Sequence, residues 1–276
     1  MSFLDNCIET TRGLAKILLQ SRGTRLKRRE RGGRIIVMGN GPSLAGTIRD
    51  HMDLLQRTDT LAVNFAANDA AFREIKPRYY LLADPHFFSE RTDANLMSLW
   101  ANLSDADWDL TIIVPHKFQG KTYELLRLVG GSQAKVATFN AVGIEGFDVL
   151  SNTAYWLKLG MPRPRNVLIP AIMVAIWLKY KEIVIVGADH SWMESLRVND
   201  HNQIMAVQHH FYDEPGEEEC RVAEEYRGYH IHQIVQSMAV AFKSYHQIAN
   251  FASHNGVKIY NATPGSYIDA FERIKL

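Results

Sequence analysis

The chain has 276 residues, 46% of them hydrophobic and 22% charged, which is ordinary for a globular protein of one large or two small domains. Lys and Arg number 31 against 30 Asp and Glu, yet residues 1–34 hold nine of the basic residues and only three of the acidic ones. Because the basic charge is gathered in one segment, we do not expect a uniformly basic surface that binds nucleic acid.

The two cysteines, Cys7 and Cys220, lie far apart and form no metal-binding or redox motif. This usage predicts free thiols in a reducing cytoplasm. The sequence has no continuous apolar signal-peptide core and no apolar run of about 18 residues, the length that a membrane span needs. We therefore expect neither secretion nor a membrane span.

Residues 1–33 are expected to form an N-terminal amphipathic helix and a basic linker. Apolar side chains recur at roughly helical spacing, and a stretch rich in Lys and Arg runs from Arg22 to Arg31. Such a segment can lie on an anionic lipid surface, which predicts a peripheral contact with the inner membrane. The alternatives are a helix docked on its own domain, or on a second copy in a homo-oligomer. The apolar positions are Phe3, Leu4, Ile8, Leu14, Ile17, Leu18 and Leu19.

Residues 34–276 are expected to form one α/β domain that begins with a buried strand and a glycine-rich turn. The apolar run Ile35-Ile36-Val37-Met38 shows no alternation, which favours a parallel strand buried on both faces. The turn Gly39-Asn40-Gly41-Pro42-Ser43 follows. Its glycines would let a phosphate approach the backbone, Asn40 and Ser43 offer hydrogen bonds, and the next helix would present free N–H groups to an anion. The spacing matches neither a dinucleotide fingerprint nor a P-loop.

Further short strands alternate with helices along the chain, and polar residues stand at their carboxyl ends. Asn64 and Asp84 close two of these strands, and Gly187, Asp189 and His190 follow another. This pattern predicts a Rossmann-like, doubly wound, mostly parallel sheet whose strand ends line a ligand crevice. The strands are expected at residues 60–65, 78–85, 110–115, 135–139, 181–186 and 257–260, and a helix apolar nearly all round at 167–179.

The region from about residue 190 to 235 is too long and polar for a simple connection. It contains His201, His209, His210, His230 and His232. Long segments of this kind in compact domains are often binding loops, so a lid-like insertion over the crevice is expected.

Several short motifs in this order carry a resemblance to a known family. They are Gly39-Asn40-Gly41-Pro42-Ser43-Leu44, Val63-Asn64-Phe65, Asp84-Pro85-His86-Phe87-Phe88 and Gly187-Ala188-Asp189. In order and spacing, roughly residues 34–275 resemble the small bacterial sialyltransferases of glycosyltransferase family 42. The chain is also similar to bacterial surface-polysaccharide and flagellin-modifying proteins that share the Gly-x-Gly-Pro-Ser-Leu start. The resemblance implies a variant of the GT-A fold.

The resemblance also implies an activity, which is inverting transfer of a sugar from a CMP-activated nonulosonic acid to a glycan acceptor without a metal or other cofactor. The family uses a loop histidine as base, and we choose His210 because the sequence His-Phe-Tyr-Asp puts a hydroxyl and a carboxylate beside it. Tyr212 would supply a hydroxyl to the leaving phosphate. Asp84 falls where the family has an asparagine. The expected donor-binding residues are Gly39, Asn40, Gly41, Pro42, Ser43, Asn64, Asp84, Gly187, Asp189, His190 and Tyr212.

The chemistry supports this choice independently. An attacking hydroxyl needs a base with a pKa near neutrality, which histidine supplies, and a nucleoside monophosphate leaves readily when hydrogen-bond donors stabilise its charge. The chain departs from the family at Asn166–Pro170, where the family has a Ser/Thr-Gly-rich segment, and at His190-Ser191-Trp192, where it has aromatic residues. Both segments contact donor or acceptor in the family.

Three other functions are compatible with the same residues. A metal-dependent hydrolase would use Asp189, His190 and loop histidines as ligands, although no H-E-x-x-H spacing is present. A nucleotide pyrophosphokinase of the same Gly-Pro-Ser-Leu group is the second alternative. The third is a non-catalytic scaffold of a polysaccharide assembly complex that uses its N-terminal helix as the contact.

Overall fold

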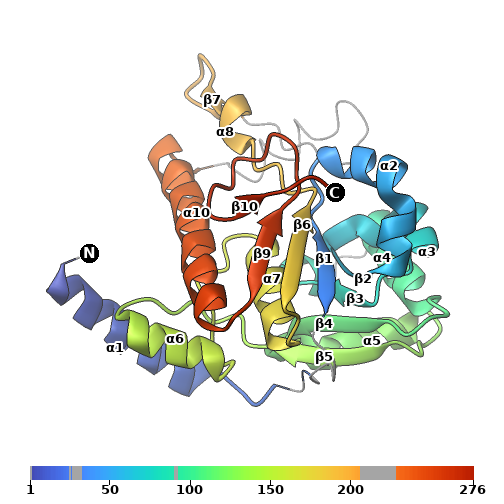
Figure 1. The fold of residues 1–276 in the computed structure, drawn as a ribbon, viewed down its shortest axis with the longest axis horizontal. Helices are drawn as coiled ribbons and strands as arrows, with labels where there is room; N and C mark the ends of the chain where they lie inside the picture. Colours follow the sequence, from blue (N-terminus) through green and yellow to red (C-terminus); the bar gives the residue numbers. More distant parts are fainter. Residues whose placement is uncertain (1, 25, 27–32, 90–92, 206–227) are drawn as a thin grey trace.

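The fold is known from a computed structural model, which describes residues 2–24, 26, 33–89, 93–205 and 228–276 (Figure 1). Its centre is an eight-stranded sheet with the strand order β10-β9-β6-β1-β2-β3-β4-β5, in which every neighbouring pair is parallel. The strands are β1 (Arg34–Met38), β2 (Asp59–Val63), β3 (Tyr79–Leu81), β4 (Thr111–Pro115), β5 (Lys135–Phe139), β6 (Glu182–Val186), β9 (Lys258–Asn261) and β10 (Glu272–Arg273). The predicted Rossmann-like α/β fold is confirmed.

Successive side chains of β1 enter two different hydrophobic cores. Ile35 and Val37 belong to one cluster, whereas Ile36 and Met38 belong to the other, and all four are buried. A strand covered by helices on both faces has no polar side, which is why its sequence shows no alternation. The chain runs from β1 through β2 to β5 in one direction and from β6 through β9 to β10 in the other. The switch point therefore lies between β1 and β6.

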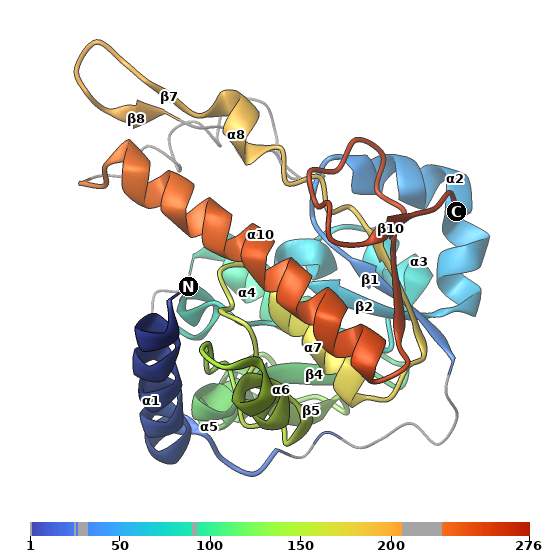
Figure 2. The ribbon, with the colours of Figure 1, turned by 60° about the vertical axis from the view of Figure 1, so that its left-hand side comes forward.

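Helices cover both faces of the sheet. The helix α7 lies between the sheet and α10, and all ten of its residues are buried, as its uniformly apolar sequence predicts (Figure 2). The helices are α1 (Phe3–Gln20), α2 (Ser43–Arg57), α3 (Ala71–Ile75), α4 (Ala94–Ser104), α5 (Gln119–Leu128), α6 (Asp148–Trp156), α7 (Leu168–Trp177), α8 (Trp192–Ser195) and α10 (Ile231–His254). Three short 3-10 helices are η1 (Asn64–Asn68), η2 (Pro85–Phe88) and η3 (His116–Phe118).

The helix α1 lies beside α6 (Figures 1 and 2). Most of its less exposed residues are polar or small. The Thr10 hydroxyl accepts a hydrogen bond from the Phe147 backbone N–H at 3.0 Å, and Gly13 is buried. Glu9 forms an ion pair with Arg163 at 3.3 Å. Ile17 packs against the core, but the other apolar side chains are exposed, and Leu18 is 82% exposed. Of the predicted alternatives, docking on its own domain is thus observed, but it leaves most of the apolar face uncovered.

Part of the predicted insertion forms an arm next to the start of α10. The helix α8 leads into the antiparallel strands β7 (Arg197–Val198) and β8 (Ile204–Met205), and Ile204 packs with Ile234 and Met238 of α10. Figure 2 shows this hairpin projecting beyond the sheet. Residues 206–227, which include His210 and Tyr212, lie outside the described residues. Among the described helices, none combines the length and hydropathy that crossing a membrane requires.

Candidate functional site

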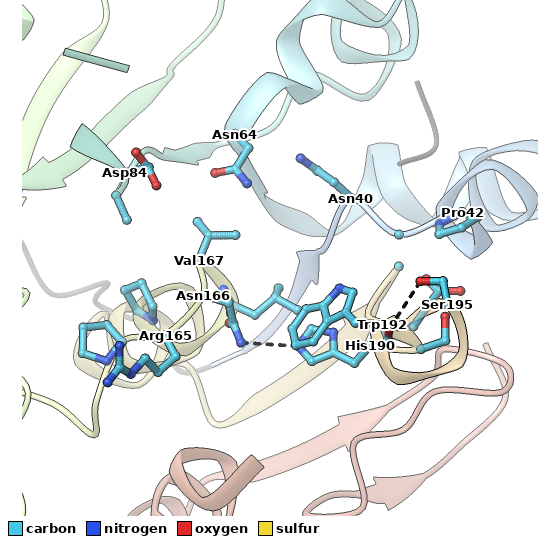
Figure 3. Close-up of a pocket in the computed structure, with 18 of the residues that line it drawn as sticks. Asn40, Pro42, Asn64, Asp84, Arg165, Asn166, Val167, His190, Trp192 and Ser195 are labelled. Carbon is cyan, nitrogen blue, oxygen red and sulfur yellow. Dashed lines mark hydrogen bonds between the residues drawn. The ribbon is translucent and has the colours of Figure 1, made fainter. Parts of the chain in front are cut away.

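The carboxyl ends of β1, β2, β3 and β6 open into one pocket of about 500 Å³, a volume typical of small-molecule sites. The pocket lies at the switch point, where open α/β sheets bind their ligands. Polar side chains from separate parts of the chain point toward it (Figure 3). Of the predicted donor-binding residues, those that line it are Asn40, Gly41, Pro42, Asn64, Asp84, Gly187, Asp189 and His190.

The turns after β1 and β6 cross in direct backbone contact. The Gly39 N–H donates to the Val186 carbonyl and the Gly41 N–H to the Gly187 carbonyl, each at 2.8 Å. A Cβ on Gly39 would lie 2.4 Å from the Gly187 oxygen, and Gly187 has a φ of +64°. The crossing alone therefore requires these glycines. Their role toward a phosphate stays a prediction.

The Asp189 carboxylate lies at the N-terminus of α2. Its Oδ2 accepts a hydrogen bond from the Ser43 hydroxyl at 2.8 Å, and its Oδ1 accepts from the Ser43 backbone N–H at 3.3 Å. A carboxylate at this end of a helix is stabilised by the helix dipole. Ser43 itself does not line the pocket. The anion position that the sequence assigns to a ligand phosphate thus already holds a side-chain carboxylate.

Asn40 and Asn64 connect neighbouring strand ends. Asn40 is buried, and its Nδ2 donates to the Val63 carbonyl at 3.2 Å, which ties the turn after β1 to the end of β2. Asn64 begins η1 with a φ of +52°, and its carbonyl accepts a hydrogen bond from the Tyr80 hydroxyl. Figure 3 shows both side chains on the same wall of the pocket.

Asp84 caps η2, because its carboxylate accepts from the His86 backbone N–H at 2.8 Å. The side chain lies on the exposed rim of the pocket. Asp84 follows β3, whereas Asp189 follows β6. The two predicted carboxylates therefore enter the pocket from different strands.

The segment that precedes α7 forms a further wall of the pocket. The resemblance places Asn166–Pro170 where the family contacts donor or acceptor, but Arg165, Asn166 and Val167 were not among the expected donor-binding residues. Arg165, Asn166 and Val167 line the pocket there. The Asn166 Oδ1 accepts from the backbone N–H groups of Leu168 at 3.0 Å and Ile169 at 3.3 Å. An asparagine directly before an apolar run is an N-cap signal, so this role was accessible from the sequence.

Arg165 is the cation of this wall. Its side chain is exposed, and within the described residues its guanidinium has no ion-pair or hydrogen-bond partner. The charged residues that share the pocket with it are Asp84, Asp189 and Glu194, all of them acidic. Arg165 is thus the positive group with which the described part of the pocket can meet an anion.

His190 is the histidine that the described residues bring into the pocket. It is 7% exposed, and burial lowers its pKa to about 3. Its Nε2 lies 2.6 Å from the Tyr245 hydroxyl of α10, which also donates to the Asn166 Oδ1 at 3.0 Å. The indole of Trp192 lies against the imidazole with 4.1 Å between ring centroids. Burial raises the pKa of Tyr245 above its ordinary value.

The other histidines of the predicted insertion take different positions. His201 is exposed in the loop between β7 and β8. His230 and His232 stack on each other at the exposed start of α10 without lining the pocket. His209 and the proposed base His210 lie outside the described residues, so the role of His210 stays a prediction.

In the described part of the chain, no three His, Cys, Asp or Glu side chains gather closely enough to hold a metal ion. Asp189 and His190, which the metal-dependent alternative would use, are bonded to Ser43 and Tyr245. Asp105 and Asp107, a second pair of carboxylates, precede β4, pair with Arg73 and Lys76, and do not line the pocket.

Comparisons with known proteins give one informative likeness. No protein-family model matches the sequence, and no curated protein matches it either. Among solved structures, the MAf glycosyltransferase from Magnetospirillum magneticum AMB-1 is similar, with a TM-score of 0.52 and 11% sequence identity over 99% of this chain. The match spans 38% of that protein, so this chain corresponds to well under half of its length. The likeness shows a shared fold, whereas the resemblance to family 42 sialyltransferases stays a prediction.

Proposed function

We propose that this chain is a glycosyltransferase that binds a nucleotide-activated sugar in the switch-point pocket. The observation that carries the proposal is the convergence of Asn40, Asn64 and His190, from three strand ends, with Arg165 in one pocket. The fold shared with the MAf glycosyltransferase adds support. A shared fold does not by itself determine function, so the proposal depends mainly on the chemistry of the pocket.

The donor phosphate belongs on the Arg165 wall in this proposal. The N-terminus of α2 holds the Asp189 carboxylate, and a phosphate there would face a like charge. The N-terminus of α7 is capped by the neutral side chain of Asn166 and lies next to the guanidinium of Arg165. A planar guanidinium can donate two parallel hydrogen bonds to a phosphate. This wall therefore offers a positive charge, and the side chain that caps the neighbouring helix is neutral and does not repel a phosphate.

The finer form of the proposal is a CMP-activated nonulosonic acid donor, transferred with inversion to a bacterial surface glycan without a metal. As the acceptor hydroxyl forms its bond to the anomeric carbon, the bond from that carbon to the phosphate oxygen breaks. The acceptor proton passes to the base, for which we retain His210, and the CMP phosphate leaves with its electron pair. Arg165 and Tyr212 would stabilise the charge on that phosphate.

A thermal-shift screen tests the donor class. Saturating binding to the folded state raises its stability by about 2.7 kcal/mol at a hundredfold excess of ligand over Kd. We expect CMP and CMP-sugars to raise Tm more than UDP, GDP and their sugars. A preference for UDP or GDP would overturn the CMP donor. No shift with any nucleotide would favour the non-catalytic scaffold.

Activity measurements with a chelator separate the enzymatic alternatives. Full transfer activity in the presence of EDTA is expected for a metal-independent transferase. Stoichiometric metal in the purified protein, together with loss of activity in EDTA, would favour the hydrolase. Release of pyrophosphoryl products from ATP would favour the pyrophosphokinase.

The proposal also places the protein in the cytoplasm, in peripheral contact with the inner membrane through α1. Phe3, Leu4 and Leu19 are each more than 70% exposed there. The sequence that follows is rich in Lys and Arg, which suits anionic lipid. We expect the full chain to float with vesicles that contain phosphatidylglycerol, and the double variant Phe3→Ser/Leu19→Ser to lose this binding. Tyr123→Ser, an exposed position on α5, serves as the control. A dimer that dissociates in the double variant would assign the face to a homo-oligomer instead.

A further inference from the structure

We propose that His190 is a neutral recognition residue, protonated on Nε2, whose Nδ1 lone pair accepts a hydrogen bond from a hydroxyl or amide N–H of the sugar in the pocket. The identity of the ligand as a sugar rests on the proposed function. The tautomer follows from a hydrogen-bond chain that can be traced from the backbone outward.

The chain starts at Asn166, whose amide orientation is fixed by two backbone donors. The N–H groups of Leu168 and Ile169 both point at the Asn166 Oδ1, at 3.0 and 3.3 Å. A backbone N–H can only donate, so the atom that faces them must be the amide oxygen. Asn166 therefore cannot be flipped without the loss of both bonds.

The second link is the Tyr245 hydroxyl, which has a single proton to donate. It lies 3.0 Å from the Asn166 Oδ1, which can only accept, so the proton of Tyr245 is directed there. The same hydroxyl oxygen lies 2.6 Å from the His190 Nε2. With its proton used, the oxygen can only accept from His190, and the proton of this bond belongs to Nε2.

The opposite tautomer fits the distances poorly. With the proton on Nδ1, the Nε2 lone pair and the lone pair of the Tyr245 oxygen would face each other at 2.6 Å. The amide nitrogen of Asn166 lies 3.5 Å from Nε2, at the outer limit of a hydrogen bond, and would offer little compensation (Figure 3). The Nε2–H form satisfies the shorter bonds to Tyr245 and to the Asn166 Oδ1, and gives up only the 3.5 Å contact of the Asn166 amide nitrogen.

The surroundings of the ring keep it uncharged. The rings around the imidazole are those of Trp192, Phe242 and Tyr245, with centroids 4.1, 6.3 and 5.4 Å away. The neighbouring carboxylate of Asp189 is bonded to Ser43. The hydrogen-bond chain ends at an amide and not at a carboxylate, so it offers no counter-charge to an imidazolium. Burial accordingly keeps the pKa of His190 far below neutrality.

This arrangement leaves Nδ1 as the polar atom of the ring that a ligand can use. None of the described residues forms a hydrogen bond with Nδ1, and the ring lines the pocket. A neutral acceptor beside the indole of Trp192 suits an uncharged donor group on a sugar and disfavours a carboxylate or phosphate. Those charged groups are left to Arg165. We therefore assign His190 to sugar recognition and not to proton abstraction.

Long-range ¹H–¹⁵N correlation NMR of the full chain tests the tautomer without any ligand. The His190 signals are assigned as those that disappear in the His190→Gln variant. In the wild-type chain at pH 7, we expect these signals to show a neutral ring with the proton on Nε2. In Tyr245→Phe the acceptor for this proton is lost, and the signal is expected to change toward the Nδ1–H form. Asn166→Asp retains an oxygen acceptor for Tyr245 and should keep a proton on Nε2, and its carboxylate, a counter-charge that the wild-type chain lacks, should raise the pKa of the ring. A charged ring or an Nδ1–H pattern in the wild-type chain overturns the proposal.

Titration with sugars tests recognition. The probes are CMP-, UDP- and GDP-sugars and the corresponding free sugars, and we expect the bound sugar to shift the Nδ1 resonance. His190→Asn, which can place an oxygen near the position of Nδ1, should bind within a few-fold of wild type, whereas His190→Leu should bind on the order of tenfold more weakly. If no probe shifts the Nδ1 resonance, the recognition role is refuted. If free sugars shift this resonance and nucleotide sugars bind no more tightly than free sugars, the transferase proposal fails while the recognition role of His190 holds.

Discussion

The carboxylate of Asp189 caps the helix that begins at Ser43, with Oδ2 2.8 Å from the hydroxyl and Oδ1 3.3 Å from the backbone N–H. This pair joins the turn after β6 to the helix after β1 across the switch point. The Asp189 carboxylate satisfies the Ser43 N–H and places a negative charge where a ligand phosphate would otherwise bind. These bonds give the two residues a structural role, and in the proposed function the donor phosphate is assigned to the Arg165 wall instead.

Asp189→Asn should lower stability without improving nucleotide binding. Loss of the charge at a helix N-terminus and of a charge-assisted hydrogen bond is expected to cost about 0.5–2 kcal/mol, measured by urea unfolding. Ser43→Ala, which removes the same side-chain bond from the other partner, should cost a similar amount. A nucleotide that bound markedly more tightly to Asp189→Asn would show that the phosphate does approach the start of α2.

Gly187→Ala should be strongly destabilising. A Cβ at this position would lie 2.4 Å from the Gly39 carbonyl oxygen, and the φ of +64° is unfavourable for alanine. We expect a loss of more than about 2 kcal/mol in the free energy of unfolding. The matched control is Gly120→Ala in α5, where nothing lies within 4 Å of the added Cβ. That change should be neutral or slightly stabilising, and equal effects of the two substitutions would contradict the crossing of the turns.

Arg165→Met should weaken binding of CMP while leaving stability nearly unchanged. The side chain is exposed and has no partner within the described residues, so its removal breaks no internal contact. Loss of a charge-assisted hydrogen bond to phosphate is expected to cost about 1.5–3 kcal/mol of binding free energy, measured by calorimetry. Cytidine, which lacks the phosphate, should bind both proteins equally. The assignment of the phosphate wall is wrong if CMP affinity is unchanged and Tm is also unchanged.

Stability should fall as the pH falls below about 6.5, the ordinary pKa of histidine, because of His190. Its pKa in the folded protein is lowered to about 3 by burial, so between these values the unfolded chain binds a proton that the folded chain does not. The contribution of His190 to the free energy of unfolding is fully present above the pKa of the residue in the unfolded chain. It is lost as the pH falls toward 3, at up to about 1.4 kcal/mol per pH unit. Urea unfolding at pH 7, 6 and 5 measures it. In His190→Gln this part of the slope should disappear, and an unchanged slope would contradict a buried, neutral ring.

The sheet and part of the pocket were predictable because their signals are local. The apolar run at Ile35–Met38 indicates a strand buried on both faces, and Asn64 and Asp84 mark strand ends by their polarity. Parallel strands bring such ends to one edge, which is why these two residues share the pocket. The two-residue strand β10, with both residues exposed, has no comparable pattern and was not predicted.

The rest of the pocket depends on strand order, which short sequence patterns do not encode. Arg165 and Asn166 follow no strand end, and they reach the pocket because α7 packs under β1 and β2. Tyr245 lies 55 residues after His190 in the middle of an amphipathic helix, where an aromatic residue indicates only a core position. The sequence likewise suggested a phosphate at Ser43, because nothing in it reveals that Asp189 occupies that helix end.

The final prediction separates two roles for histidine in the proposed reaction. A general base takes its proton only as the transition state forms, so its removal typically slows turnover by about 10²–10⁴-fold and leaves donor binding nearly intact. His210→Ala should show this kinetic pattern, and the adjacent His209→Ala is its control. His190 has a pKa far below neutrality, and the hydrogen-bond chain that it joins contains no carboxylate. His190→Leu should therefore chiefly raise KM and leave the pH dependence of kcat unchanged, and His190→Asn should change kcat little. Wild-type turnover in His210→Ala, together with a large loss of kcat in His190→Asn, would transfer the role of the base to His190.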